Sequence, residues 1–175
     1  MPLTIKQITG SDYLTLSDLS KSIYKEYYLH LWHPGGADWY QEEYAYHPDK
    51  LKAELEDSNN LHFMVYENDE SLGYLKIRIN AILKGFEDRN SFEIERIYLH
   101  KKIAGKGIGR QLMQLSETIA KENDKQIIFL KAMDSSTDAI AFYQKMGYTI
   151  CGTLVLPFEQ MKEECRGMVI LSKEL

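Results

Sequence analysis

Three glycines alternate with other residues in the segment AGKGIGR, which covers Ala104–Arg110. Glycine has no Cβ atom, so this backbone can turn sharply and approach a ligand closely. Apolar residues with helical spacing follow directly, so the free N–H groups of a helix start point out of the loop. Because the helix dipole favours negative charge at that end, the segment predicts an anion site that a pyrophosphate would fit.

Two known phosphate-binding motifs do not match this loop. A Walker loop requires Ser or Thr after its Gly-Lys pair, and none stands there. A dinucleotide fingerprint has the spacing G-x-G-x-x-G near the first strand of a βαβ unit, whereas this spacing is G-x-G-x-G and lies deep in the chain. A glycine-rich helix entry without a ligand is the remaining alternative.

Glu93 and Glu95 alternate with Ile94 and Arg96 in a segment with strand composition. Successive side chains of a strand point to opposite faces, so we expect both carboxylates on one face. Such a pair could attract a cationic amine and relay its proton through water. The alternative is that one or both only form ion pairs with Arg96 or Lys76.

Aromatic residues are concentrated around the first two expected helices, between positions 24 and 46. With the acidic residues of the same stretch, they could hold an ammonium group by cation–π contact and charge attraction. Alternatively, they form core or a dimer surface. The candidate substrate-binding residues are Tyr28, Trp32, Trp39 and Tyr40, and the acidic residues are Glu26, Asp38, Glu42 and Glu43.

Composition and charge narrow the remaining classes of function. The 175 residues suit one domain, 1–175, with a sizeable core. A net charge of −5 argues against nucleic-acid binding. No apolar run approaches the roughly 18 residues of a membrane span, and the polar N-terminal segment is unlike a signal peptide, so we expect a cytoplasmic protein. Neither the histidines nor Cys151 and Cys165 have metal-ligand spacing, so we expect no metal.

Hydrophobic periodicity predicts a mixed α/β chain with the element order βααβββαβαββ. That order is typical of a mixed, mostly antiparallel sheet of about seven strands flanked by about four helices. The expected strands are 3–8, 61–66, 72–79, 92–99, 126–130, 148–156 and 166–171. The first expected helix is capped by Ser11 or Asp12 and runs to Tyr27. The others cover 38–56 with a break near Pro48, 108–123, and 137–145, and Gly147 ends the last of them.

Two motifs in this order resemble the GCN5-related N-acetyltransferases (GNAT). The glycine loop is similar to their signature after the fourth strand, although Ala104 stands where the family has Arg or Gln. About thirty residues later, AIAFYQKMGY (Ala139–Tyr148) looks like their late helix and the turn into the next strand. The strand EIERIYL (Glu93–Leu99) is also similar to the fourth strand of PaiA-type diamine and polyamine acetyltransferases.

The resemblance implies that acetyl-CoA lies in a V-shaped opening between the fourth and fifth strands. Its pantetheine arm would pair with backbone groups of the segment Ile97, Tyr98 and Leu99. Its pyrophosphate would bind amides of the loop residues Gly105, Lys106, Gly107, Ile108, Gly109 and Arg110. Ser136 replaces a family Asn near the pantetheine, and Lys145 is a further candidate for the nucleotide phosphates.

The resemblance also assigns catalytic roles. Tyr143 matches the tyrosine that protonates the departing thiolate, and the backbone N–H of Leu99 would hold the carbonyl oxygen. Glu93 aligns better with the family's catalytic glutamate, but a bulge in the strand would shift the count to Glu95.

These assignments favour direct transfer of an acetyl group to a primary amine of a small molecule, with a polyamine or diamine as the preferred acceptor. The alternatives are acetylation of a protein N-terminus or lysine, and a non-catalytic acyl-CoA-binding regulatory domain. We expect a monomer or homodimer.

Overall fold

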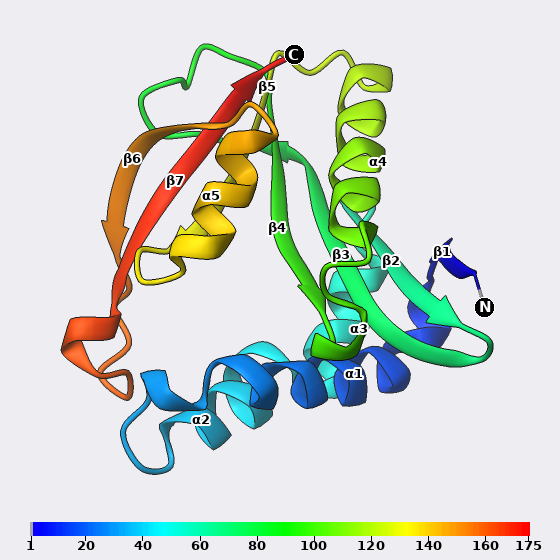
Figure 1. Cartoon of the computed structure of the whole chain (residues 1–175), viewed down its shortest axis with the longest axis vertical. Coiled ribbons are helices and arrows are strands. Elements are labelled where there is room, and N and C mark those ends of the chain that lie inside the picture. Colours follow the sequence, from blue (N-terminus) through cyan, green and yellow to red (C-terminus); the bar gives the residue numbers. More distant parts are fainter. Residues whose placement is uncertain (1) are drawn as a thin grey trace.

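The computed structural model describes residues 2–175, and these form a seven-stranded sheet in the spatial order β1-β2-β3-β4-β5-β7-β6 (Figure 1). Neighbouring strands are antiparallel except β4 and β5, which are parallel. This confirms the expected mixed and mostly antiparallel sheet. The strands are β1 (Leu3–Gln7), β2 (Asn60–Glu67), β3 (Glu70–Ala81), β4 (Ser91–Leu99), β5 (Ile127–Met133), β6 (Thr149–Val155) and β7 (Gly167–Glu174).

Helices cover both faces of the sheet, as Figure 1 shows. On one face lie α1 (Tyr13–Tyr27), α2 (Gly36–Trp39) and α3 (Pro48–Glu56). On the other face lie α4 (Ile108–Glu122) and α5 (Thr137–Lys145). α1 and α4 each turn an apolar stripe toward the strands, so the sheet is buried from both sides near its centre.

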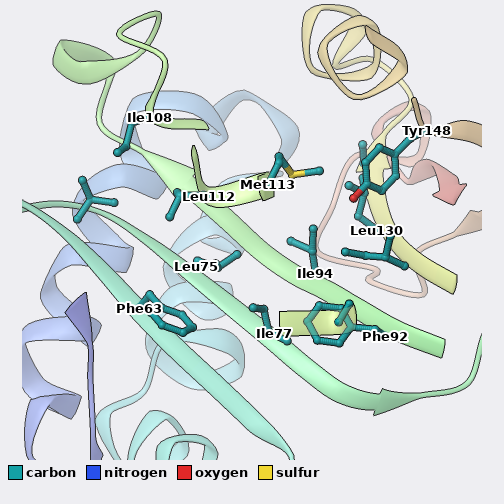
Figure 2. Close-up of a cluster of buried hydrophobic side chains, with 14 of the residues drawn as sticks. Phe63, Leu75, Ile77, Phe92, Ile94, Ile108, Leu112, Met113, Leu130 and Tyr148 are labelled. Carbon is teal, nitrogen blue, oxygen red and sulfur yellow. The ribbon is translucent and has the colours of Figure 1, made fainter. Parts of the chain in front are cut away.

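Side chains alternate between the two faces of the sheet along each strand, so the hydrophobic core has two parts, one on each face. Leu75 and Ile77 of β3 pack toward α4, where they meet Leu112 and Met113 (Figure 2). The intervening side chains of β3 point to the opposite face, and Tyr74 there joins the core under α1. This two-sided burial fixes the direction of every side chain on β4, the strand that carries most of the candidate site.

The second expected helix is the main correction to the fold. Instead of one helix over 38–56, the chain forms α2, then a π-helical segment over Tyr40–Ala45, and then α3. Pro48 begins α3. Proline is tolerated at the first helical position because the backbone N–H that it lacks would have no acceptor within the helix there. His47 caps this helix, since its Nδ1 accepts from the Asp49 amide at 3.3 Å. The anticipated break at Pro48 is therefore confirmed.

The other elements differ from prediction only at their ends. Asp12 occupies the position before α1, but its carboxylate accepts from the Thr9 amide at 2.8 Å rather than from the helix. The short strand expected at 126–130 extends to Met133, and the last strand extends to Glu174. Gly147 has φ +93°, the left-handed conformation expected after α5.

Two classes of feature are absent from residues 2–175. No helix in this range is both long and apolar enough to cross a membrane. Within the same range, no three His, Cys, Asp or Glu side chains gather in a way that could hold a metal ion.

Candidate active site

β4 and β5 are paired only over their first halves. The parallel pairing stops at Ile94 and Leu130, although β4 continues to Leu99 and β5 to Met133. In Figure 1, β4 diverges from β5 and β7 toward the side where α1 lies. This is the divergence that the resemblance implied between the fourth and fifth strands.

The divergence leaves one edge of β4 without a partner strand in the described chain. The His100 amide donates to a β3 carbonyl at 2.9 Å, so the backbone polar groups of His100 face β3. These groups alternate along an antiparallel strand, so those of Tyr98 also face β3, whereas those of Ile97 and Leu99 face the opening. The Leu99 carbonyl there accepts from the Tyr27 hydroxyl at 2.9 Å. Ile97 and Leu99 can therefore pair with an extended ligand, while Tyr98 offers only its side chain.

The glycine loop lies beside this edge and opens α4. Gly105 and Gly107 have φ of +78° and +81°, a conformation that side chains with a Cβ adopt only at a cost. A Cβ added at either glycine would meet no atom within 4 Å, so the loop is open on its outer surface. The first amides of α4, from Ile108 to Arg110, have no acceptor within the helix. The loop can therefore present several N–H donors to one anion.

The other residues assigned to acetyl-CoA lie in this loop, at the opening or on α5. Ala104 and Lys106 are exposed in the loop, whereas the Ile108 side chain is buried in the core and leaves only its amide for a ligand. Ser136 is the residue before α5 and lines the opening, and Lys145 is exposed at the last turn of α5.

A cavity of about 400 Å³ occupies the opening between β4, β5, α1 and the loop that joins β6 to β7. The residues Glu93–Tyr98 of β4 and Leu130–Met133 of β5 line it from the sheet. Tyr143 of α5 lines it as well. The tertiary structure thus brings both candidate carboxylates and the candidate acid into one space.

Tyr143 is half-buried in the wall of the cavity. Burial raises the pKa of its phenol to about 12, because the charged form would lose its hydration. The hydroxyl therefore keeps its proton throughout the neutral range. A protonated phenol in this position can donate to an anion that forms in the cavity.

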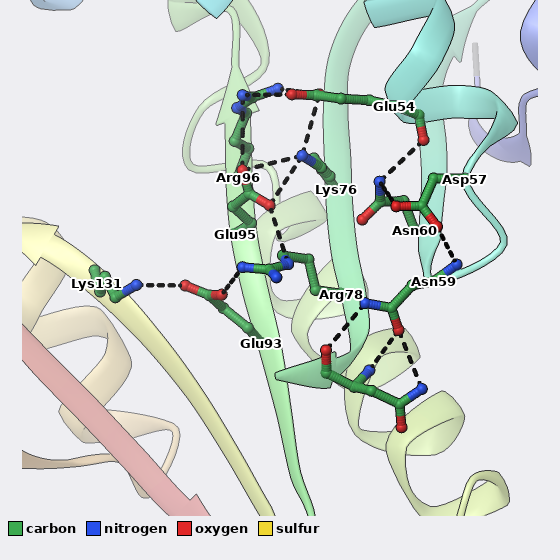
Figure 3. Close-up of polar contacts among 11 residues, drawn as sticks. Glu54, Asp57, Asn59, Asn60, Lys76, Arg78, Glu93, Glu95, Arg96 and Lys131 are labelled. Atoms are coloured by element: carbon green, nitrogen blue, oxygen red, sulfur yellow. Dashed lines mark hydrogen bonds and ion pairs between the residues drawn. The ribbon is translucent and has the colours of Figure 1, made fainter. Parts of the chain in front are cut away.

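Both candidate carboxylates contact cations. Glu93 lies 2.9 Å from the Nζ of Lys131 and 3.5 Å from Arg78. Glu95 lies 2.9 Å from the Nζ of Lys76 and 3.7 Å from Arg96. Figure 3 shows these contacts as one continuous row. The ion pairs that the sequence left as an alternative therefore exist, and they lie inside the cavity wall.

Glu54 of α3 joins this row by bridging Arg96 and Lys76. Its carboxylate lies 2.9 Å from Arg96 and 3.1 Å from the Nζ of Lys76. Burial alone would raise its pKa, but the two cations hold the pKa of Glu54 below its ordinary value. No sequence signal pointed to Glu54, since it lies far along the chain from both Lys76 and Arg96 and looks like an ordinary helix glutamate.

A bulge in β4 explains how the two carboxylates share a face with Arg96. The β3–β4 register shifts between Lys76↔Arg96 and Ile77↔Ile94, so Glu95 is the additional residue. A bulge re-aims side chains locally. Glu93 and Glu95 both contact Arg78, so they lie on the same side of β4, as expected.

A sequence profile of the acetyltransferase (GNAT) family matches residues 22–148 of this chain. The match spans the glycine loop, β4 and α5, the elements that build the cavity. The chain belongs to the GNAT family.

Known proteins with similar sequence or structure agree with this membership. An uncharacterised N-acetyltransferase of Lactobacillus delbrueckii subsp. lactis is 32% identical over 101 residues, which is 58% of this GNAT chain and 58% of that protein. The PaiA N-acetyltransferase of Thermoplasma acidophilum, solved with coenzyme A, superposes over the full length of both chains with a TM-score of 0.78 at 20% identity. Spermidine N-acetyltransferase SpeG of Vibrio cholerae, a single-site variant, has a TM-score of 0.69 at 17% identity, covering 98% of this chain and 93% of that one.

The aromatic residues of this GNAT protein divide into two layers. Tyr28 and Tyr40 line the cavity, together with Tyr24 and Tyr44. Trp32 and Trp39, which the sequence assigned to substrate contacts, do not line it. Trp32 is 4% exposed, donates its indole N–H to the Tyr24 hydroxyl at 2.9 Å and packs on Tyr40 with ring centroids 4.9 Å apart. The tryptophans therefore support the wall rather than form it.

The loop between β6 and β7 forms one wall of the cavity, and sequence reasoning missed it. Leu156, Phe158 and Met161 of this loop line the cavity. The loop is attached to the segment before α2, because the His33 amide donates to the Gln160 carbonyl at 3.0 Å. An apolar loop between two strands gives no local sign that it packs against a distant helix entry.

Proposed function

We propose that this GNAT protein transfers the acetyl group of acetyl-CoA directly to the primary amine of a small molecule. The observation that carries the proposal is the meeting of Tyr143, Glu93 and Glu95 in one cavity beside the free edge of β4. The similarity to solved acetyltransferases supports the fold, and the site residues support the chemistry.

The chain offers a fitting place for the cosubstrate. The open amides of the loop from Gly105 to Arg110 suit its pyrophosphate. The edge of Ile97 and Leu99 suits the pantetheine arm, whose amides can pair with it as a strand does. When bound, acetyl-CoA supplies the activated acetyl thioester. Ser136 and Lys145 stay candidates for further contacts with it.

The protein residues then handle two protons. As the amine nitrogen forms its bond to the acetyl carbon, the carbon–sulfur bond breaks and the sulfur leaves with its electron pair. The Tyr143 hydroxyl, which is protonated at neutral pH, gives its proton to that sulfur. The proton lost by the amine passes to Glu93 or Glu95, directly or through water. The Leu99 amide, which faces the opening, holds the carbonyl oxygen.

The loop between β6 and β7 walls one side of the cavity with Leu156, Phe158 and Met161, and this narrowing favours a small acceptor over a protein segment. A polyamine or diamine stays the sequence-based hypothesis for the acceptor, and a spermidine acetyltransferase among the similar structures is consistent with it. Cytoplasmic location and a monomeric or homodimeric state stay predictions.

The test is a thiol-release assay with acetyl-CoA and a panel of primary amines, run on the wild type and on Tyr143→Phe. We expect Tyr143→Phe to lower kcat about 100-fold, a usual contribution of a positioned acid, with the Kd for acetyl-CoA unchanged. Tyr66→Phe is the matched control, because its hydroxyl contacts only a methionine sulfur on β2 outside the cavity. Tight coenzyme A binding without turnover of any amine would instead support the regulatory-domain alternative.

A further inference from the structure

Seven charged side chains form a continuous row of ion pairs (Figure 3), and all of them except Lys76 and Arg78 line the cavity. We call them the charge ladder, and each contacts the next within 4.0 Å. Four are basic and three are acidic, so the ladder carries one positive charge more than its carboxylates neutralise. In order, the members are Lys131, Glu93, Arg78, Glu95, Lys76, Glu54 and Arg96.

Every carboxylate of the ladder is already engaged by at least two cations. Glu54 contacts Lys76 and Arg96, and Glu93 contacts Lys131 and Arg78. Glu95 contacts three of the four cations. An ammonium group that entered the cavity would therefore find no carboxylate without a partner.

The unused hydrogen-bonding capacity lies on the two most exposed cations of the ladder, Lys131 and Arg78, and of these only Lys131 lines the cavity. The Lys131 side chain is 40% exposed, lines the cavity and has one carboxylate partner, although an ammonium carries three donors. The Arg78 side chain is 45% exposed, and its two contacts are long, at 3.5 and 4.0 Å. The inner cations are 5% and 11% exposed and are each held by two carboxylates.

The acidic residues that the sequence offered for a polycation lie elsewhere. Glu26, Asp38, Glu42 and Glu43 are not among the residues that line the cavity. Glu26 is held by the His100 ring at 2.7 Å and by the Lys101 amide at 2.8 Å. The charges that line the cavity are therefore those of the ladder, apart from Lys76 and Arg78, and that of Lys50.

From the unfilled donors of Lys131 and the excess positive charge of the ladder, we infer that the acceptor is a primary amine that also carries an anionic group, a carboxylate or a phosphate. Lys131 binds that group. The inference rests on the proposed function and narrows its substrate class. An anionic oxygen would complete the coordination of Lys131 and neutralise the excess charge of the ladder, with Arg78 adding to the positive potential behind it. A polyamine would instead place a second cation beside Lys131, and that repulsion lowers its affinity.

The test compares amines that differ only in the anionic group. Ornithine is putrescine with one carboxylate, and O-phosphoethanolamine is ethanolamine with one phosphate, so each pair isolates the anion. We expect kcat/KM to be at least about tenfold higher for the anionic member of one pair, the value of a charge-assisted contact at a partly exposed site. The pair with the larger ratio distinguishes carboxylate from phosphate. A ratio of one or below in both pairs, or a preference for spermidine, would overturn the inference.

Substitution of Lys131 provides the second readout. Lys131→Gln should reduce the ratio within the favoured pair to near one, and Lys131→Glu should invert it. Because the ratio compares two acceptors on one variant, any general effect on Glu93 cancels. Arg89→Gln is the matched control, since Arg89 pairs with Glu174 outside the cavity, and it should keep the wild-type ratio. An unchanged ratio in Lys131→Gln would refute the role of Lys131. Absence of turnover with every amine would instead refute the proposed function.

Discussion

Gly36 determines how closely the loop between β6 and β7 packs over the cavity. It is buried at the start of α2, and a Cβ added there would lie 2.5 Å from the Gln160 carbonyl oxygen and 3.2 Å from the Trp32 ring. The carbonyl is backbone and cannot swing away as a side chain would. Gly36→Ala should therefore push the loop outward.

The magnitude follows from these contacts. Cβ atoms do not approach other atoms within 3.0 Å, so the carbonyl must retreat by about 0.5 Å or more. That retreat weakens the 3.0 Å hydrogen bond from the His33 amide, worth about 1 kcal/mol. Overpacking adds about 1–2 kcal/mol. For a chain of this size, about 2–3 kcal/mol lowers Tm by roughly 4–12 °C.

The assay combines thermal unfolding with steady-state kinetics. Met161 and Phe158 line the cavity from the displaced loop, so the KM for the acceptor should rise about 3–10-fold, which is about 1 kcal/mol of lost contact. The KM for acetyl-CoA should stay within about twofold, because the loop from Gly105 to Arg110 lies elsewhere. Gly152→Ala is the control, since its Cβ would meet the Ile170 side chain at an acceptable 3.4 Å. If Gly36→Ala matched the control in both Tm and acceptor KM, the loop would not be held as described.

Three further predictions test the ladder, the buried histidine and the glycine loop. Glu54→Gln should lower the free energy of unfolding, measured by denaturant titration, by about 3–5 kcal/mol. The substitution removes a carboxylate that Lys76 and Arg96 share and leaves both buried cations with Glu95 as their remaining partner. A loss below about 1 kcal/mol would contradict this reasoning. Burial, with Lys76 nearby, lowers the pKa of His62 to about 4, so this side chain is neutral in the folded protein at neutral pH. Its contribution to the free energy of unfolding is therefore complete above about pH 6.5, the pKa of an unfolded histidine, and is lost as the pH falls toward 4. The wild type should lose about 2.5 kcal/mol more than His62→Gln between pH 7 and 4.5, and parallel curves would refute the assignment. Gly107→Ala should lower the free energy of unfolding by about 1 kcal/mol, because φ at this position is +81°. It should also raise the Kd for coenzyme A, measured by isothermal titration calorimetry, at least tenfold. An unchanged Kd would count against the loop as the pyrophosphate site.

Local sequence patterns were enough to predict the elements and the family. The apolar stripe from Ile108 to Ile119 predicted α4, and alternation predicted β4, because both periods follow from backbone geometry alone. The glycines at 105 and 107 indicated a sharp turn before a helix, and in the structure both have positive φ at the start of α4. Pro48 likewise indicated the break that separates α3 from the residues before it.

The chemistry of the cavity depends on contacts between residues far apart in the chain. Glu54 meets Lys76 and Arg96 across two elements, and Lys131 meets Glu93 only because β5 lies parallel to β4. The sequence also did not determine which aromatic side chains line the cavity and which pack behind them. Helical spacing places a ring on one face of a helix but does not say which neighbouring element that face contacts.

The sequence by itself thus determined which loop is proposed to bind a phosphate and which strand carries the carboxylates, because glycine conformation and strand alternation are local properties. Only the tertiary structure decided the net charge of the ladder. That charge is a sum over side chains from α3, β3, β4 and β5, and their order along the chain does not reveal which of them end up in contact.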